Sequence, residues 1–393
     1  MTKPVVGILT WREGTKFEEP GYMKRLIRAG EALGATVYLF AYQDVNLENK
    51  KIRGFTLTST GRWQSRTYPW PDVVIDRCRK GVEGYKRLRK QKELFTYANG
   101  TYTNKWTATQ LFSKEENLQR WIPKTVSYSP ANLAVMLKEF PLLYLKPGNG
   151  TGGRSILKIE RTPQGYQLLG RAKNLIKKSA HFRSEASLIN WLNRWVNQEK
   201  IRNGNFMIQQ GLDLALIPQR VSDTRLLIQK NEQGEWQVTG LGVRVGPLGS
   251  PTSNLHGGGK PLAFNKVMVE RFGLEKAKLI RAECQELAMQ VVQTIEKYFG
   301  SMMEFGLDIG IDVMGEVWLI EVNPKPGREI FKELGSLDLY RKSIERPIQY
   351  AMHLVKAKNE GPITAENIQP VEHQEGTDDT VIELGPRNKL NEV

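Results

Sequence analysis

The chain has 393 residues, enough for two or three packed domains, and its formal net charge is +15. No apolar run approaches the roughly 18–20 residues that cross a membrane, and the start MTKPVVGILTW lacks a signal-peptide pattern, so we expect a cytoplasmic protein. The two cysteines, Cys78 and Cys284, and four scattered histidines exclude a disulfide framework and a zinc site built on these residues.

The surplus of positive charge predicts an anionic partner. The densest basic stretch, Arg77–Lys92, contains one aromatic residue, Tyr85. Surfaces that bind nucleic acid usually place base-stacking aromatics among their charges, so this composition argues against nucleic acid. Two interpretations stay open: a solvated helix face, or a surface that meets an acidic substrate or nucleotide phosphates.

Residues 4–100 alternate between strand and helix patterns. The runs PVVGILT, ATVYLFAY and PDVVID read as strands, and EEPGYMKRLIRAGEALG reads as an amphipathic helix that ends at Gly34. This alternation predicts a small parallel α/β domain over residues 1–100. Functional loops follow the carboxyl ends of such strands, which predicts a working edge at Thr10–Lys16 and Asp76–Lys80.

The next region, residues 101–212, contains a glycine-rich segment, LLYLKPGNGTGGRSILKI, at residues 142–159. Its G-x-G-x-x-G pattern is not followed by the helix of a dinucleotide fold, it lacks the Gly-Lys-Ser/Thr of a Walker loop, and protein-kinase signals are absent. We therefore expect a flap between antiparallel strands whose backbone N–H groups cradle phosphates, with Lys146 supplying an ammonium group. A glycine-rich surface hairpin is the alternative. A helix is predicted at Ser184–Gln198, with Ser184 as its N-cap.

Residues 213–355 form a third region with the strands DTRLLIQK and WQVTGLGVRV and a long helix that ends near Gly300. The loop Gly246–Lys260 is rich in Gly, Ser and Pro, which predicts either a lid that closes over the reacting groups or a plain surface loop. Residues 356–393 are polar and poor in apolar side chains, which predicts a disordered tail.

The most informative segment is FGLDIGIDVMGEVWLIEVN, residues 305–323. Two strand-like runs flank Met314-Gly315, which predicts a hairpin with a two-residue turn. With that turn, Asp308 lies directly opposite Glu321.

The alternation of side chains places Asn323 on the same face as Glu321 and predicts that Trp318 and Ile320 pack in the core on the other face. Two adjacent carboxylates and an amide oxygen suit Mg²⁺, which takes one or two protein carboxylates together with water and substrate phosphates. A solvated acidic face is the alternative interpretation.

The flap, the lysine before it and the acidic hairpin resemble, in this order, the ATP-grasp superfamily. The resemblance implies an ATP-grasp fold of α/β and α+β type, with an N-terminal pre-grasp α/β domain, a lobe with the flap and a lobe with the Mg²⁺ hairpin. The residues implied in ATP binding are Lys105 of TNKWTATQLF, Lys146, the flap residues Gly148, Asn149, Gly150, Thr151, Gly152 and Gly153, and the hinge residues Gln209, Gln210, Gly211 and Leu212. Metal binding is assigned to Asp308, Glu321 and Asn323, catalysis to Arg225, Arg244 and Asn254, and recognition of an acidic substrate to Arg77 and Arg328.

Within that superfamily the chain resembles the YheC/YheD-type endospore coat-associated proteins, through VVIDRCRK, LYLKPGNGTGGRSI, RVGPLGSPTSNLHGGGK and VWLIEVNPKPGR. The resemblance implies an ATP- and Mg²⁺-dependent ligase that joins a carboxylate to an amine or thiol through an acylphosphate, in the cytoplasm or at the spore coat. An anionic small molecule or peptide is the expected substrate, and coat components are expected partners. Two alternatives remain: an ATP-grasp kinase of small molecules, and a non-catalytic coat protein that retains ATP binding.

Overall fold

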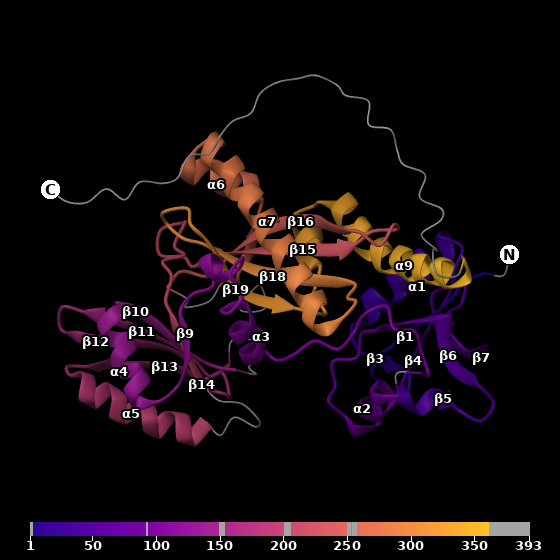
Figure 1. Cartoon of the computed structure of the whole chain (residues 1–393), viewed down its shortest axis with the longest axis horizontal. Coiled ribbons are helices and arrows are strands. Elements are labelled where there is room, and N and C mark those ends of the chain that lie inside the picture. The colour runs from indigo at the N-terminus through magenta and orange to yellow at the C-terminus, as the bar shows by residue number, and fades with distance from the viewer. Residues whose placement is uncertain are drawn as a thin grey trace.

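The computed structural model describes residues 3–91, 93–148, 154–199, 206–249, 253 and 258–360. These residues form three large sheets that follow one another along the molecule (Figure 1). The N-terminal sheet lies at one end, the sheet of residues 125–210 at the other, and the third sheet between them. The mixed α/β and α+β architecture predicted from the sequence is confirmed.

The N-terminal sheet has the order β5-β6-β4-β1-β8, with β7 added beside β6. Its strands are β1 (Val5–Leu9), β4 (Thr36–Phe40), β5 (Val45–Asn46), β6 (Lys51–Leu57), β7 (Trp63–Pro69) and β8 (Val73–Asp76). The central strand β1 runs parallel to β4 and β8, whereas β6 is antiparallel to both β4 and β7. The prediction of a parallel sheet therefore holds for β1, β4 and β8 and is wrong for the outer strands.

Two helices from opposite ends of the chain cover this sheet. Helix α1 (Pro20–Ala32) packs against α9 (Leu337–Glu360), and buried Leu26 and Ile27 share one core with Ile348 and Ala351. A short hairpin, β2 (Arg12–Glu13) with β3 (Lys16–Phe17), and helix α2 (Glu83–Lys90) complete this part.

The second sheet is antiparallel throughout and has the order β13-β12-β11-β10-β14-β9. Its strands are β9 (Thr125–Ser127), β10 (Leu142–Pro147), β11 (Ile156–Thr162), β12 (Gly165–Arg171), β13 (Lys177–Phe182) and β14 (Phe206–Gln210). Helices α4 (Pro130–Glu139) and α5 (Glu185–Glu199) bury one face, where Leu188 and Leu192 pack with Leu143 and Leu157. Ser184 accepts a hydrogen bond from the N–H of Ser187 at 3.3 Å, as predicted for an N-cap.

The third sheet is also antiparallel and has the order β17-β16-β15-β18-β19. Its strands are β15 (Ser222–Lys230), β16 (Trp236–Val245), β17 (Lys260–Leu262), β18 (Glu304–Ile311) and β19 (Val317–Asn323). The helices beside it are α3 (Lys105–Phe112), α6 (Phe264–Phe272), α7 (Leu274–Phe299) and α8 (Glu329–Glu333). Helix α7 buries Cys284, Leu287 and Val291 against strand residues such as Leu226 and Leu307, so its apolar stripe forms the core of this lobe.

The acidic hairpin has the predicted pairing at its functional end but a different turn. Asp308 lies opposite Glu321, as predicted. The strands are connected by residues 312–316 rather than by a two-residue turn. The carboxylate of Asp312 accepts hydrogen bonds from the N–H groups of Met314 and Glu316 at 2.9 and 3.0 Å, which stabilises this longer loop.

A bulge separates the two ends of the hairpin. The pairing shifts between Asp308 and Ile309, which leaves Ile320 as the extra residue on β19. Val317 and Leu319 therefore occupy the core, while Trp318 and Ile320 are only partly buried. The prediction that Trp318 and Ile320 pack in the core is wrong because the bulge inverts the alternation toward the turn.

A buried cluster of charges joins the first and third sheets. Glu304, at the start of β18, accepts a hydrogen bond at 2.9 Å from Arg77, which follows β8. Arg328 also binds Glu304, and Gln229 of β15 donates to its second oxygen at 2.9 Å. The ring of Tyr22 on α1 contacts both guanidinium groups, at 5.1 Å and 4.4 Å from its centroid.

Helix α9 continues through Glu360, so the first residues of the predicted tail are helical, and residues 361–393 lie outside the described ranges. The domain boundaries at residues 100, 212 and 355 stay predictions. Within the described part of the chain, no helix combines the length and apolar character needed to cross a membrane.

We predict that Glu304→Gln destabilises the protein by roughly 3–5 kcal/mol, because two buried arginines lose the charge that compensates them. Urea unfolding followed by circular dichroism measures the change. Glu286→Gln removes one partner of the exposed Arg120–Glu286 pair and serves as a control, with an expected effect of about 0.5 kcal/mol or less. Equal effects of the two substitutions would contradict the structural role of Glu304.

Candidate functional site

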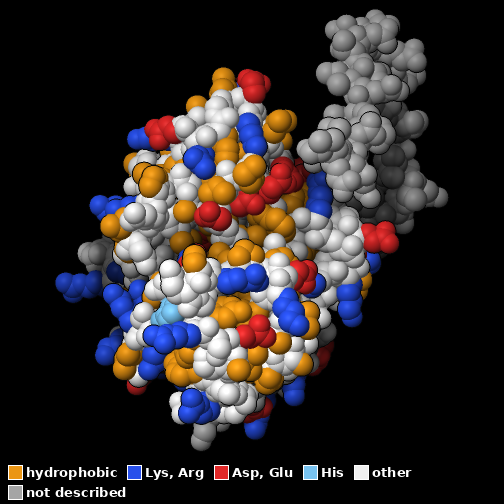
Figure 2. All heavy atoms as spheres, turned by 90° about the vertical axis from the view of Figure 1, so that its left-hand side faces the viewer, with side chains coloured by type: hydrophobic (Ala, Val, Ile, Leu, Met, Phe, Trp, Pro, Cys, Tyr) orange, Lys and Arg blue, Asp and Glu red, His pale blue; other side chains and the backbone are white. Residues whose placement is uncertain are grey.

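A cavity of about 1010 Å³ lies where the second and third sheets face each other, and it extends toward the N-terminal sheet. Its lining comes from α3, β10, β14, β15, β16, β18 and β19, with Glu19 and Arg79 at the N-terminal side. Figure 2 shows the surface hollowed in this region, with acidic and basic side chains around the hollow. A volume at the upper end of the usual range for ligand sites leaves room for more than one reactant.

The acidic hairpin supplies three oxygen-bearing side chains to this cavity: Asp308, Glu321 and Asn323. Asn323 lies opposite Gly306 in the ladder, next to the Asp308–Glu321 pair. A Cβ at Gly306 would come within 2.7 Å of Pro326 Cβ and 2.8 Å of Arg225 Nη1, so glycine at this position leaves space for both side chains.

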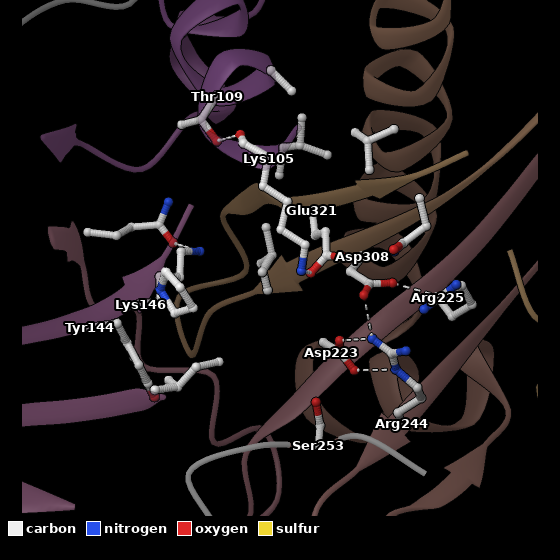
Figure 3. Close-up of a pocket in the computed structure, with 18 of the residues that line it drawn as sticks. Lys105, Thr109, Tyr144, Lys146, Asp223, Arg225, Arg244, Ser253, Asp308 and Glu321 are labelled. Carbon is white, nitrogen blue, oxygen red and sulfur yellow. Dashed lines mark hydrogen bonds and ion pairs between the residues drawn. The ribbon is translucent and has the colours of Figure 1, made fainter. Parts of the chain in front are cut away.

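Asp308 lies between two arginines, one from the adjacent strand β15 and one from β16 beyond it. Arg225 of β15 places Nε 2.8 Å from Oδ1, and Arg244 of β16 places Nη2 3.0 Å from Oδ2 (Figure 3). Arg244 also donates from Nε to Asp223 at 2.8 Å. Burial alone would raise the pKa of Asp308, but the charges of Arg225 and Arg244 outweigh it and hold the pKa below its ordinary value.

Glu321 is paired with a lysine from a different element. Asn104 caps α3 by accepting a hydrogen bond from the N–H of Thr107 at 3.0 Å, and Lys105 is the first residue of this helix. From there Lys105 extends to Glu321, with Nζ 2.8 Å from Oε2 (Figure 3). Both side chains are partly exposed to the cavity, so either is accessible to a ligand.

Lys146 reaches the cavity from the last part of β10. Its Nζ donates to Oε1 of Gln209 on β14 at 2.6 Å, and the side chain is mostly buried. Burial lowers the pKa of Lys146 to about 8, against the opposing attraction of Glu321 and with a smaller lowering by Lys105. The two lysines expected from the sequence are thus brought to one cavity.

The expected hinge is placed in part at the cavity. Gln209, Gln210 and Leu212 line it, whereas Gly211 turns its N–H to the carbonyl of Leu142 at 2.8 Å. In the described part of the chain, the N–H of Leu212 has no hydrogen-bond partner, so it is available to a ligand.

Tyr144 and Arg171 are among the lining residues that the sequence reasoning missed. Tyr144 precedes Lys146 by two residues and shares its face, so strand alternation would have indicated it. Burial raises its pKa to about 12. Arg171 reaches the cavity because β12 pairs it with Ile156, a register set by the tight turn between Thr162 and Gly165, and this turn is the signal that could have indicated it.

The structure does not bring Arg77 and Arg328 to the cavity lining. Both side chains are buried around Glu304 and Tyr22, where they connect the first and third sheets. Their expected role in binding an acidic substrate is therefore corrected to a structural one. Arg79 is the arginine of this segment that does line the cavity, where it pairs with Glu19 at 3.1 Å.

Several expected site residues cannot be placed. Gly148 is described, and its carbonyl accepts a hydrogen bond from the N–H of Trp106 at 3.2 Å, which links the end of β10 to α3. The residues that lie outside the described ranges are Asn149, Gly150, Thr151, Gly152, Gly153 and Asn254.

The hairpin residues fit a hard cation. No group of three or more His, Cys, Asp and Glu side chains converges among the described residues, so a transition-metal site of that kind is not seen there. Asp308 Oδ1 is buried without a hydrogen bond from the described residues, although the charge of Arg225 lies nearby. Together with Glu321 and Asn323, this oxygen offers the small set of hard ligands that Mg²⁺ uses beside phosphates.

Solved structures show the same fold. The chain is 11% identical to the D-alanine-D-alanine ligase from Coxiella burnetii, with a TM-score of 0.53 over 91% of this chain and 98% of that chain. It is 12% identical to the ATP-grasp ligase PsnB in complex with a minimal precursor, with a TM-score of 0.51 over 89% of this chain and 100% of that chain. The protein has an ATP-grasp fold.

The YheC/D-like ATP-grasp family model matches residues 94–354, and the chain belongs to this family. A curated relative is the endospore coat-associated protein YheD of Bacillus subtilis (strain 168), which is 28% identical over 367 residues. That alignment covers 89% of this chain and 79% of the relative. The expected family is therefore confirmed.

The lowered pKa of Lys146 predicts a measurable pH dependence of stability. The pKa of Lys146 is about 8 in the folded protein and 10.5 in the unfolded chain. At pH values between these two, the unfolded chain binds more protons at this site, so the free energy of unfolding of the wild type rises with pH. Relative to Lys146→Met, we expect the wild type to gain roughly 2–3 kcal/mol across this window. Urea unfolding of both proteins at pH about 7.5 and about 10 measures the gain, and a constant difference would contradict it.

Proposed function

We propose that this protein is an ATP- and Mg²⁺-dependent ligase that joins a carboxylate to an amine or thiol through an acylphosphate. The observation that supports this proposal is the convergence of two lysines and two carboxylates in one cavity. Lys105 comes from α3 and Lys146 from the second sheet, whereas Asp308 and Glu321 come from the third. Membership of the ATP-grasp fold supports ATP as the nucleotide.

The nucleotide lies between the second and third sheets in this proposal. Its base meets the backbone of the hinge from Gln209 to Leu212, where the N–H of Leu212, which has no partner among the described residues, donates to a ring nitrogen. Its phosphates extend toward Lys105 and Lys146. Lys105 is paired with a carboxylate, whereas the printed partner of Lys146 is the neutral amide of Gln209. Two lysines with one directly paired carboxylate favour a polyanion at this position.

Asp308, Glu321 and Asn323 hold Mg²⁺ in this proposal. Bound Mg²⁺ supplies neutralisation of the negative charge on the phosphates and on the phosphoryl group in transfer. Lys105 then exchanges its contact with Glu321 for phosphate oxygens, which frees the Glu321 carboxylate. Arg225 and Arg244 keep the Asp308 carboxylate ionised, so that it binds a cation over the whole neutral pH range.

The reaction proceeds in two steps. A carboxylate oxygen of the first substrate attacks the γ-phosphorus of ATP, the bond to the β-γ bridging oxygen breaks, and the products are an acylphosphate and ADP. The amine or thiol of the second substrate then attacks the acyl carbon, loses a proton and releases inorganic phosphate. Arg225 and Arg244 stabilise the phosphoryl oxygens, with Asn254 as a third candidate, so that catalysis rests on positioning and charge rather than on a protein nucleophile.

The substrates and setting are also part of the proposal. The positive net charge supports an anionic small molecule or peptide as substrate. The name of the relative YheD supports a role at the endospore coat, with coat components as partners. A cytoplasmic location stays part of the proposal.

Glu321→Gln should lower the rate of ATP turnover by about 100-fold or more, because one charge of the proposed Mg²⁺ site is lost. Glu316→Gln, at an exposed position of the same hairpin, is the matched control and should retain activity. Release of ADP and of phosphate is measured separately with extracts of sporulating cells as the source of substrates.

Release of both products supports a ligase, release of ADP without phosphate supports a kinase, and the absence of both supports a non-catalytic coat protein. Full turnover by Glu321→Gln would remove the hairpin from the chemistry.

A further inference from the structure

Behind Lys146, three residues form a chain of hydrogen bonds that runs away from the cavity. Lys146 Nζ donates to Gln209 Oε1 at 2.6 Å, and Gln209 Nε2 donates to Thr125 Oγ1 at 2.8 Å. The hydroxyl of Thr125 in turn donates to the carbonyl oxygen of Pro123 at 2.8 Å. The three side chains come from the adjacent strands β10, β14 and β9, where Tyr144 and Thr125 both pair with Gln209 across the sheet.

This chain fixes the orientation of the Gln209 amide. A threonine hydroxyl has a single hydrogen, and here the carbonyl of Pro123 takes it. Thr125 Oγ1 is therefore left as an acceptor, and it must face the NH₂ side of Gln209. The amide oxygen is consequently turned toward Lys146, whereas the flipped amide would point its N–H bonds at an ammonium group.

The two lysines of the site differ in the charge of their direct partners, because Gln209 is neutral. Lys105 is paired with the carboxylate of Glu321, whereas the direct partner of Lys146 is an uncharged amide. An amide oxygen holds the ammonium in place without cancelling its charge, so the full charge is available to a phosphate. A carboxylate at position 209 would form an ion pair with Lys146 and would meet a lone pair of Thr125 on its other side.

We propose that Gln209 is a positioning residue, oriented by Thr125, that aims the Lys146 ammonium at the nucleotide phosphates without pairing it directly with a carboxylate of the described residues. This inference rests on the proposed nucleotide site and adds side chains that act on Lys146 rather than on the reacting atoms. It also gives Thr125, which does not line the cavity, an effect on phosphate binding.

The effect can be separated from a contact with the nucleotide base. Calorimetric titration gives the affinities of the full-length protein for ATP with Mg²⁺ and for adenosine, and their ratio isolates the phosphate contribution. Gln209→Leu should weaken ATP binding by about tenfold and adenosine binding much less, because in the proposed site the base meets the backbone of the hinge, which this substitution retains. Gln209→Glu should lower the ATP-to-adenosine ratio as well, because the new carboxylate pairs with Lys146.

Thr125 provides the matched pair of variants. Thr125→Val keeps the shape but removes the acceptor, so ATP affinity should fall by about three- to tenfold with adenosine affinity unchanged. Thr125→Ser keeps the hydroxyl and should bind both ligands like the wild type.

The outcomes distinguish the two proposals. A wild-type protein that binds neither ligand would contradict the proposed function, and this inference with it. A wild type that binds ATP, with variants that lose ATP and adenosine affinity in equal proportion, would show that Gln209 contacts the base and would overturn the positioning role. ATP affinity unchanged in both Gln209→Leu and Thr125→Val would overturn it too.

Discussion

The site is organised around two carboxylates that face each other across one hairpin. Asp308 and Glu321 occupy opposite positions on β18 and β19, and like charges in such positions repel. Compensating charge comes from three other elements: Arg225 on β15, Arg244 on β16 and Lys105 at the start of α3. The need to neutralise this pair therefore connects the hairpin to the strands beside it and to the helix that leads into the second sheet.

The position of the hairpin depends on a second, fully buried group of charges. Glu304 begins the strand that carries Asp308 four residues later, and it is bound by Arg77 and Arg328. A buried carboxylate between two guanidinium groups is costly to separate, so the N-terminal sheet and the third sheet are held in one arrangement. The sequence analysis predicted these arginines as substrate ligands, but both form buried ion pairs with Glu304.

The sequence predicted what local pattern determines. The two-residue turn predicted at Met314-Gly315 placed Asp308 opposite Glu321; the pairing is confirmed although the turn is wrong, because the bulge at Ile320 offsets the longer loop. The strand–loop–strand arrangement around Lys146 is also confirmed. The bulge at Ile320 was not predicted, because strict alternation along both strands allows no extra residue between Leu319 and Glu321. The burial of Arg77 was missed for a similar reason: its partner Glu304 is 227 residues away, and no local pattern reports such a contact. Arg171 was missed although the tight turn between Thr162 and Gly165 sets the pairing that brings it to the cavity.

The most direct test of the account is a crystal structure of the full-length protein with Mg²⁺ and a non-hydrolysable ATP analogue. The account predicts the phosphates in contact with Lys105 and Lys146, with the metal ion bound to Asp308 and Glu321 and Lys105 moved off the Glu321 carboxylate. A nucleotide bound away from this cavity, or a bound nucleotide with Lys105 still on Glu321 and no metal at the hairpin, would contradict it.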